Sequence, residues 1–165
     1  MNDGIPETQS IVHYANIQDA ISFLKIAPNS YMANTDVQSA FCILPIHPSH
    51  YHLLGFTWRN QFYFDKCLPM GLAASCQICE TFSSALKWLA RKQLGALSVV
   101  HVLDDFLFIE QSAEACANIL SKFSAVMQST RGSPRAEQNL WSGNYNDFFM
   151  HRITRCTLRG SFTVR

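Results

Sequence analysis

The sequence predicts an α+β fold in which a small antiparallel sheet of the split βαβ type carries helices on one face. Two long segments, 73–94 and 112–127, repeat apolar residues at helical spacing. Three shorter runs, 30–37, 97–103 and 106–110, have the length and composition of strands. The order strand, helix, strand, strand, helix needs one further strand to complete such a sheet.

The composition is that of one globular domain. Of the 165 residues, 48% are hydrophobic and 15% are charged, which favours a single core over a disordered chain. No apolar run approaches the roughly 20 residues of a membrane-spanning helix, and the N-terminus lacks the pattern of a signal peptide. We therefore expect an intracellular protein (cytoplasm or nucleus) with no membrane partner and with its six cysteines reduced.

Charge is distributed unevenly along the chain. Residues 1–128 carry seven Lys or Arg against ten Asp or Glu, a net charge of −3, whereas residues 129–165 carry six Arg and two acids, a net charge of +4. Nucleic-acid-binding proteins usually place their basic residues on the folded part. Here the basic excess lies on the segment with the weakest structural pattern, so composition alone argues against strong nucleic-acid binding.

The first half of the chain predicts a helix, a strand and a hairpin. Asn16 precedes apolar residues at helical spacing that stop at Pro28, which predicts a short helix with Asn16 as its N-cap. The next run is a strand that ends at Asp36. Two alternating runs on either side of Arg59-Asn60 predict a β-hairpin over residues 51–68.

The second half predicts a helix, two strands and another helix. "PMG" (69–71) breaks the chain before the helix at 73–94, and Gly95 is suited to end it. An Asp pair forms the turn between the two strands, and Ser112 can cap the last helix. Apolar residues at helical spacing give that helix its inner face: Cys116, Leu120, Phe123 and Met127.

The segment 129–165 has no lasting helical or alternating period. It offers no clean candidate for the missing last strand, and we expect an irregular tail, disordered or frameshifted, after a partial domain at 1–128. The coding DNA tests whether the tail is frameshifted.

The stretch "SVVHVLDDFLFIE" (98–110) places two adjacent carboxylates, Asp104 and Asp105, within an apolar run. A solvated hairpin turn is one interpretation, because Asp side chains accept hydrogen bonds from nearby backbone donors. A divalent cation is the other, because it removes the repulsion between paired carboxylates. A metal site needs a third carboxylate, and Asp36 at the end of another strand is the best placed. Spacing alone leaves both interpretations open.

Three motifs in order resemble the central motifs of reverse transcriptases: "TDVQSAF" (35–41), "CLPMGLAASC" (67–76) and "VLDDF" (102–106). The resemblance runs from about Asn2 to about Gln128 and is closest to the DIRS-type, tyrosine-recombinase retrotransposons. The family has a polymerase palm with fingers and extends a primer on an RNA or DNA template with deoxynucleotides (dNTPs). The resemblance therefore implies a palm plus a remnant of the fingers. Relatives continue with a segment like K-T-x-G-P and then F-L-G, and one choice of synonymous codons for residues 138–153, read one base later, spells the similar K-T-C-G-P-A-T-T-T-T-F-L-C-I-E.

The family's metal ligands carry over onto four positions of this chain. Asp36 and Asp104 match the palm aspartates that hold two Mg²⁺ (or Mn²⁺) ions, and Asp105 matches the second residue of the paired motif. The backbone carbonyl of Val37 is an additional metal ligand in the family. The resemblance thus implies Asp36, Asp104 and Asp105 as catalytic residues in two-metal phosphoryl transfer.

Further positions match the pocket of the incoming dNTP. Phe41 matches the aromatic residue that excludes a ribose 2′-hydroxyl, the alternative being an ordinary core residue. Met70 and Gly71 match the segment that packs on the incoming nucleotide and the template. Gly71 permits close approach of the backbone, the alternative being a turn before a helix. Val102 departs from the aromatic residue usual in the family.

Two other clusters carry less weight. Cys76 and Cys79 form a C-x-x-C inside a predicted helix with no second pair at zinc spacing, which favours ordinary core or surface cysteines. The histidines of "IHPSHYH" (46–52) could form a metal site, but a structural turn is the better interpretation.

The basic finger strands of the family lie upstream of the segment that "NDGIP" resembles, so we expect the isolated chain to lack polymerase activity. Two functions stay open. One is a retrotransposon reverse transcriptase fragment; the other is a non-catalytic, palm-derived module that binds nucleic acid or protein. A metal-dependent nuclease using the same aspartates is a third, weaker possibility.

Overall fold

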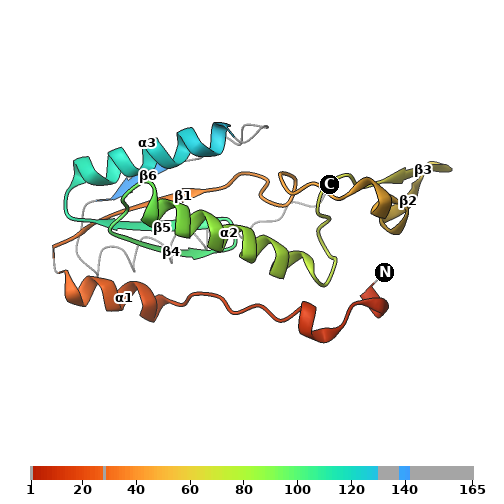
Figure 1. The fold of residues 1–165 in the computed structure, drawn as a ribbon, viewed down its shortest axis with the longest axis horizontal. Helices are drawn as coiled ribbons and strands as arrows, with labels where there is room; N and C mark the ends of the chain where they lie inside the picture. The colour runs from red at the N-terminus through yellow and green to blue at the C-terminus, as the bar shows by residue number, and fades with distance from the viewer. Residues whose placement is uncertain (1, 28, 130–137, 142–165) are drawn as a thin grey trace.

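The computed structural model describes residues 2–27, 29–129 and 138–141. Its centre is a four-stranded sheet formed by β1 (Tyr31–Asp36), β4 (Ser98–Val102), β5 (Asp105–Glu110) and β6 (Gln138–Trp141). The strand order is β4-β5-β1-β6, and each pair of neighbours is antiparallel. The fold thus mixes helices with small antiparallel sheets, as the α+β expectation requires (Figure 1).

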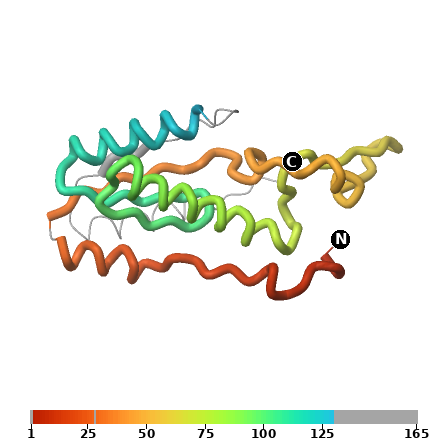
Figure 2. Tube along the Cα trace, viewed as in Figure 1, coloured from red at the N-terminus to blue at the C-terminus, as the bar shows by residue number. Residues whose placement is uncertain are grey.

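Two long helices pack on one face of this sheet. They are α2 (Ser75–Lys92) and α3 (Ala113–Ser129), and both match the predicted helical segments. Figure 2 shows α3 and the N-terminal helix on opposite sides of the strands. The buried residues between these helices and the sheet form the main core; the largest include Phe106, Phe108, Phe123, Leu120 and Val99.

The N-terminal helix α1 (Ile17–Ile26) covers the other face of the sheet. The predicted N-cap is confirmed: the Asn16 side chain accepts from the N–H groups of Gln18 and Asp19, at 2.8 and 3.3 Å. The Asp19 carboxylate in turn accepts from the Asn16 N–H at 2.7 Å, which completes a capping box. Ala20 of α1 packs with apolar side chains of the sheet: Met32, Val100, Leu107 and Ile109.

The predicted hairpin exists but is shorter than residues 51–68. It consists of β2 (Gly55–Trp58) and β3 (Gln61–Phe64), and the preceding Pro48–Leu54 forms a 3-10 helix, η3, instead of a strand. Arg59 and Asn60 both have positive φ, 48° and 62°, which is typical of the tight turns that match the twist of a hairpin. The hairpin extends from the sheet at one end of the molecule (Figure 1).

The last strand lies where the sequence analysis found no candidate. β6 pairs with β1, so that Thr35 opposes Gln138 and Met32 opposes Trp141. Its four residues are too few for an alternating pattern to stand out, which is why we missed the strand. The rest of the predicted tail, at 130–137 and 142–165, lies outside the described residues.

No helix in the described part of the chain combines the length and the apolar composition that crossing a bilayer requires. The five cysteines that the structure describes are free thiols: Cys42, Cys67, Cys76, Cys79 and Cys116.

Candidate metal site at the β4–β5 turn

The antiparallel pairing of β1 and β5 brings the predicted aspartates to one end of the sheet. Asp36, the last residue of β1, is directly opposite Asp105, the first residue of β5. The Val37 N–H donates to the Asp104 carbonyl at 2.9 Å, which extends the pairing one residue past the strand. Side chains at opposite positions of an antiparallel pair leave from the same face. Asp36 and Asp105 therefore share a face of the sheet.

Asp104 occupies a tight turn. β4 and β5 are joined by Leu103 and Asp104 alone, because Val102 pairs with Asp105. Leu103 has φ +52°, a conformation that costs a non-glycine residue energy and that recurs at functional sites. Asp104 is partly buried and lies near α2. Burial of the Cys79 thiol on that helix, and to a smaller degree the negative charge of Asp104, raise the pKa of Cys79 to about 11.

The donor chemistry fits a hard divalent cation, because carboxylate and carbonyl oxygens are the ligands that Mg²⁺ prefers. Asp36 and Asp105 would contribute from one face, with Asp104 and the Val37 carbonyl beside them. Within the described residues, however, no group of three or more His, Cys, Asp or Glu side chains is arranged to hold a metal ion. The backbone thus gathers the predicted ligands, while their side chains do not form a three-ligand cluster in this structure.

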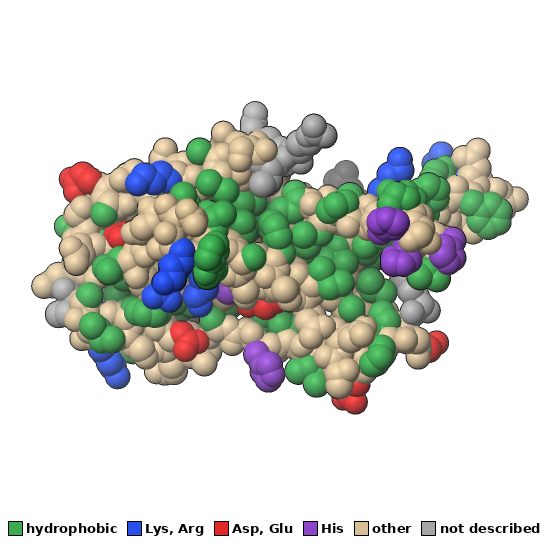
Figure 3. All heavy atoms as spheres, viewed as in Figure 1, with side chains coloured by type: hydrophobic (Ala, Val, Ile, Leu, Met, Phe, Trp, Pro, Cys, Tyr) green, Lys and Arg blue, Asp and Glu red, His purple; other side chains and the backbone are tan. Residues whose placement is uncertain are grey.

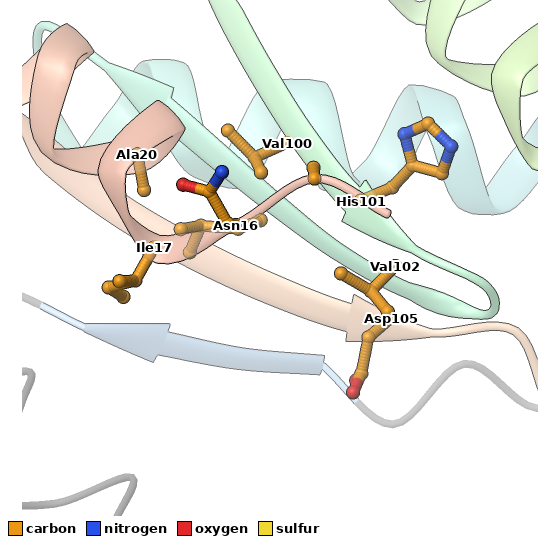
Figure 4. A pocket seen from close by; sticks show the side chains of 9 residues that line it. Asn16, Ile17, Ala20, Val100, His101, Val102 and Asp105 are labelled. Atoms are coloured by element: carbon orange, nitrogen blue, oxygen red, sulfur yellow. The ribbon is translucent and has the colours of Figure 1, made fainter. Parts of the chain in front are cut away.

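A pocket of about 290 Å³ lies between α1 and the sheet, beside this turn. Figure 4 shows Val102 and Asp105 at one end of it and Ile17 and Ala20 of α1 at the other, while the His101 ring points away toward the opposite side of the strand. Its lining is mainly apolar, and Asp105 is the only carboxylate among the lining residues.

The turn is tied to α2 through Glu80, a residue that the sequence analysis did not select. One carboxylate oxygen of Glu80 accepts from the Leu103 N–H at 2.8 Å, and the other lies 3.1 Å from Nε2 of His101. Both side chains are buried. Burial lowers the pKa of His101, although the Glu80 charge opposes that shift.

A signal for both residues was present in the sequence. His101 alternates with Val99 on the inward side of a strand, and Glu80 is adjacent to inward-facing Cys79 on its helix. A polar side chain at a core position requires a hydrogen-bond partner, so each of these residues implied another polar residue nearby.

A second backbone contact joins the chain segments that flank the predicted nucleotide-pocket residues. The Leu68 N–H donates to the Leu44 carbonyl at 2.9 Å, which connects the segment after Phe41 to the segment before Met70. Phe41 is half-buried against the main core, whereas Met70 is 79% exposed. Gly71 has φ +87° with open space where a Cβ would lie, so the turn requires glycine for its backbone conformation.

Solved structures share this fold. Two crystal structures of the prototype foamy virus protease-reverse transcriptase are similar to this chain. The native form has 22% sequence identity and a TM-score of 0.54 over 77% of this chain. The selenomethionine-labelled CSH mutant has 23% sequence identity and a TM-score of 0.53 over 61% of this chain. A foamy viral protease-reverse transcriptase in complex with an RNA/DNA hybrid has 18% identity and a TM-score of 0.53 over 67% of this chain.

The similarity covers 13–16% of those longer chains. No model of a known protein family matches the sequence, and no curated protein matches it. At these identities the likeness establishes the fold, which is similar to that of a reverse transcriptase fragment.

Proposed function

We propose that this chain is the palm-containing part of a retrotransposon reverse transcriptase, closest to the DIRS type. The main support for this proposal is the pairing of β1 with β5 within a reverse-transcriptase-like fold. In that pairing Asp36 is opposite Asp105, and the Val37 N–H donates to the Asp104 carbonyl. The strand order β4-β5-β1-β6, with two helices on one face, supports assigning the sheet as a split βαβ palm.

In this proposal Asp36, Asp104, Asp105 and the Val37 carbonyl hold two Mg²⁺ or Mn²⁺ ions. Ions bound there would supply charge neutralisation for the attacking and leaving oxygens of phosphoryl transfer. The protein's own contribution is positioning. Phe41, half-buried against the core, would exclude a ribose 2′-hydroxyl with its ring, and the exposed Met70 would pack on the incoming nucleotide.

The proposed partners are an RNA or DNA template-primer and dNTPs. One structural neighbour was solved in complex with an RNA/DNA hybrid. In this chain, a template-primer would have to approach the end of the sheet where β1 and β5 bring the aspartates together.

A non-catalytic module that binds nucleic acid or protein is the second candidate. The observation that favours it is the exposed aromatic surface of the β2–β3 hairpin, visible as apolar side chains at the hairpin end of Figure 3. Aromatic rings exposed in this way can stack on unpaired bases or pack against a protein. The residues are Phe56, Trp58, Phe62, Tyr63 and Phe64.

Metal binding and primer extension separate these functions. The purified chain is titrated with Mn²⁺, followed by electron paramagnetic resonance, and then incubated with a primed template, dNTPs and Mg²⁺ or Mn²⁺. We expect Mn²⁺ binding that Asp104→Asn weakens at least tenfold, without extension by the isolated chain. The control is Asp65→Asn, an exposed aspartate next to β3.

Each other outcome changes the conclusion. Primer extension that Asp104→Asn abolishes supports the polymerase more strongly and contradicts the expected inactivity. Equal Mn²⁺ affinity in the wild type and Asp104→Asn overturns the metal site. Template binding that is independent of metal and of Asp104 then favours the binding module, and metal-dependent strand cleavage favours a nuclease.

A further inference from the structure

One buried carboxylate connects the β4–β5 turn to helix α2. Glu80 is 9% exposed, and its two oxygens serve two different segments. One oxygen accepts from the Leu103 backbone N–H at 2.8 Å, and the other lies 3.1 Å from Nε2 of His101, a residue 5% exposed. These two contacts therefore hold both the backbone of the turn, at Leu103, and the side chain of His101 in strand β4.

The surroundings of His101 show which form of the ring meets Glu80. Its Nδ1 atom is buried with no hydrogen-bond partner in the described part of the chain. An imidazolium would place an unpaired N–H there, whereas a neutral ring protonated at Nε2 leaves only an acceptor. His101 therefore donates from Nε2, and Glu80 accepts two N–H groups at once. Ser84 Oγ, at 3.4 Å from the same nitrogen, is a weaker neighbour.

Leu103 needs such an anchor. Its φ of +52° is unfavourable for a residue with a branched side chain, and conformations of this kind persist where surrounding contacts hold them. Glu80 supplies a charge-assisted hydrogen bond to the Leu103 N–H. The next two residues are Asp104 and Asp105, so the direction of both carboxylates depends on the conformation of Leu103.

We propose that Glu80 is a positioning residue of the candidate metal site, holding the Leu103 backbone and the His101 ring so that the backbone of Asp104 and Asp105 stays at the end of the sheet where Asp36 lies. This role rests on the proposed metal-binding function. Glu80 itself does not touch the metal in this proposal. It acts through the backbone of the turn, as outer residues around metal ligands commonly do.

The demand for two acceptor oxygens makes Glu80→Gln an informative variant. Its side chain has nearly the same shape but offers one acceptor and one donor. It can satisfy both Leu103 and His101 only if His101 moves its proton to Nδ1, which buries an unpaired N–H. We therefore expect Glu80→Gln to loosen the turn while the fold persists.

A matched control lies at the other end of the same two strands. Glu110 is also buried, and its carboxylate accepts from the Leu97 N–H at 2.9 Å. Glu110→Gln removes the charge of a buried carboxylate that, like Glu80, accepts a hydrogen bond from a backbone N–H. Glu110 lies at the end of the strands opposite the turn that carries Asp104. It separates a general effect on the sheet from a specific effect on the candidate site.

The test combines amide hydrogen exchange by NMR with Mn²⁺ titration of the full chain. Glu80→Gln should speed exchange of the Leu103 amide and weaken Mn²⁺ binding about tenfold. The Leu97 amide should stay protected, which shows that the variant is folded. Glu110→Gln should leave Mn²⁺ affinity unchanged. Should Glu80→Gln fail to fold, Glu80→Asp, which keeps the charge but shortens the reach, replaces it with the same expectation.

Two outcomes contradict the proposal in distinguishable ways. If the wild type binds Mn²⁺ and Glu80→Gln binds it equally well, the positioning role is overturned and the metal site stands. If the wild type binds no Mn²⁺, or Asp104→Asn binds as the wild type does, the proposed metal site fails and the role of Glu80 fails with it.

Discussion

Asp36 and Asp105 face each other across the β1–β5 pair as direct cross-strand partners. Like charges at such positions oppose strand pairing by roughly 0.2–1 kcal/mol. A divalent cation bound at this end of the sheet would remove that repulsion.

Neutralising Asp36 should weaken metal binding at the proposed site. We expect Asp36→Asn to lower the affinity for Mn²⁺ about tenfold, because it removes the charge of one proposed ligand. Electron paramagnetic resonance during a Mn²⁺ titration measures this change. Asp65→Asn is the control, because Asp65 is exposed and is not among the proposed ligands. Equal Mn²⁺ affinity in the wild type and Asp36→Asn would contradict the role of Asp36.

Removing the cap of α1 should weaken its cover over the sheet. Asn16→Ala deletes the acceptor for two backbone N–H groups and should lower the free energy of unfolding by about 1 kcal/mol. Asn16→Asp keeps an acceptor at the same place and should remain close to the wild type. Urea denaturation followed by circular dichroism compares the three proteins, and equal stability of the Ala variant would show that the cap is dispensable.

Gly71 should not tolerate a side chain even though space is available. Its φ of +87° makes Gly71→Ala strained, and we expect a loss of about 1–2 kcal/mol in the free energy of unfolding. Gly4 is also in open space but has no such φ, so Gly4→Ala should be neutral. Thermal denaturation of both variants tests the difference. Similar losses in both variants would contradict the positive φ of Gly71 as the cause, because Gly→Ala lowers the entropy of the unfolded chain and so favours folding at a position without strain.

Stability should fall in mild acid because of His101. Burial holds the pKa of His101 below 6.5, while the Glu80 charge raises it and the Lys87 charge lowers it further. The unfolded chain therefore takes up this proton at higher pH than the folded one. The contribution of neutral His101 to the free energy of unfolding is complete above pH 6.5. It is lost as the pH falls from 6.5 toward the pKa of His101 in the folded state.

Urea denaturation at several pH values between 5 and 8 measures this dependence, roughly the range over which histidines titrate. His101→Gln should flatten the slope below pH 6.5, and the exposed His13→Gln should leave it unchanged. An unchanged slope in the His101 variant would assign the acid sensitivity to other groups.

Local patterns predicted most of the elements. The N-cap at Asn16, the hairpin turn at Arg59-Asn60 and the α2 and α3 segments follow from capping, turn chemistry and helical spacing, all of which act over a few residues. Two errors came from segments where tertiary pairing decides. Residues 51–54 form part of a 3-10 helix, and β6 is a short strand whose position is set by pairing with β1.

The candidate site could be predicted only in part. The chain order and strand ends gave Asp36, Asp104 and Asp105, and the structure brings their backbones together. The contact of Glu80 with Leu103 joins residues 23 apart in the sequence, and it depends on how α2 lies on the sheet. Periodicity says which side of an element is buried, but it does not say which buried polar groups meet.

The β2–β3 hairpin meets the rest of the protein chiefly through η3 and the 44–46 and 66–68 backbone contacts, and all eight of its strand residues are exposed. A unit held this loosely opens without unfolding its neighbours. Its amides should exchange in deuterated solvent before those of the four-stranded sheet, and a protease should cut the hairpin while that sheet stays intact.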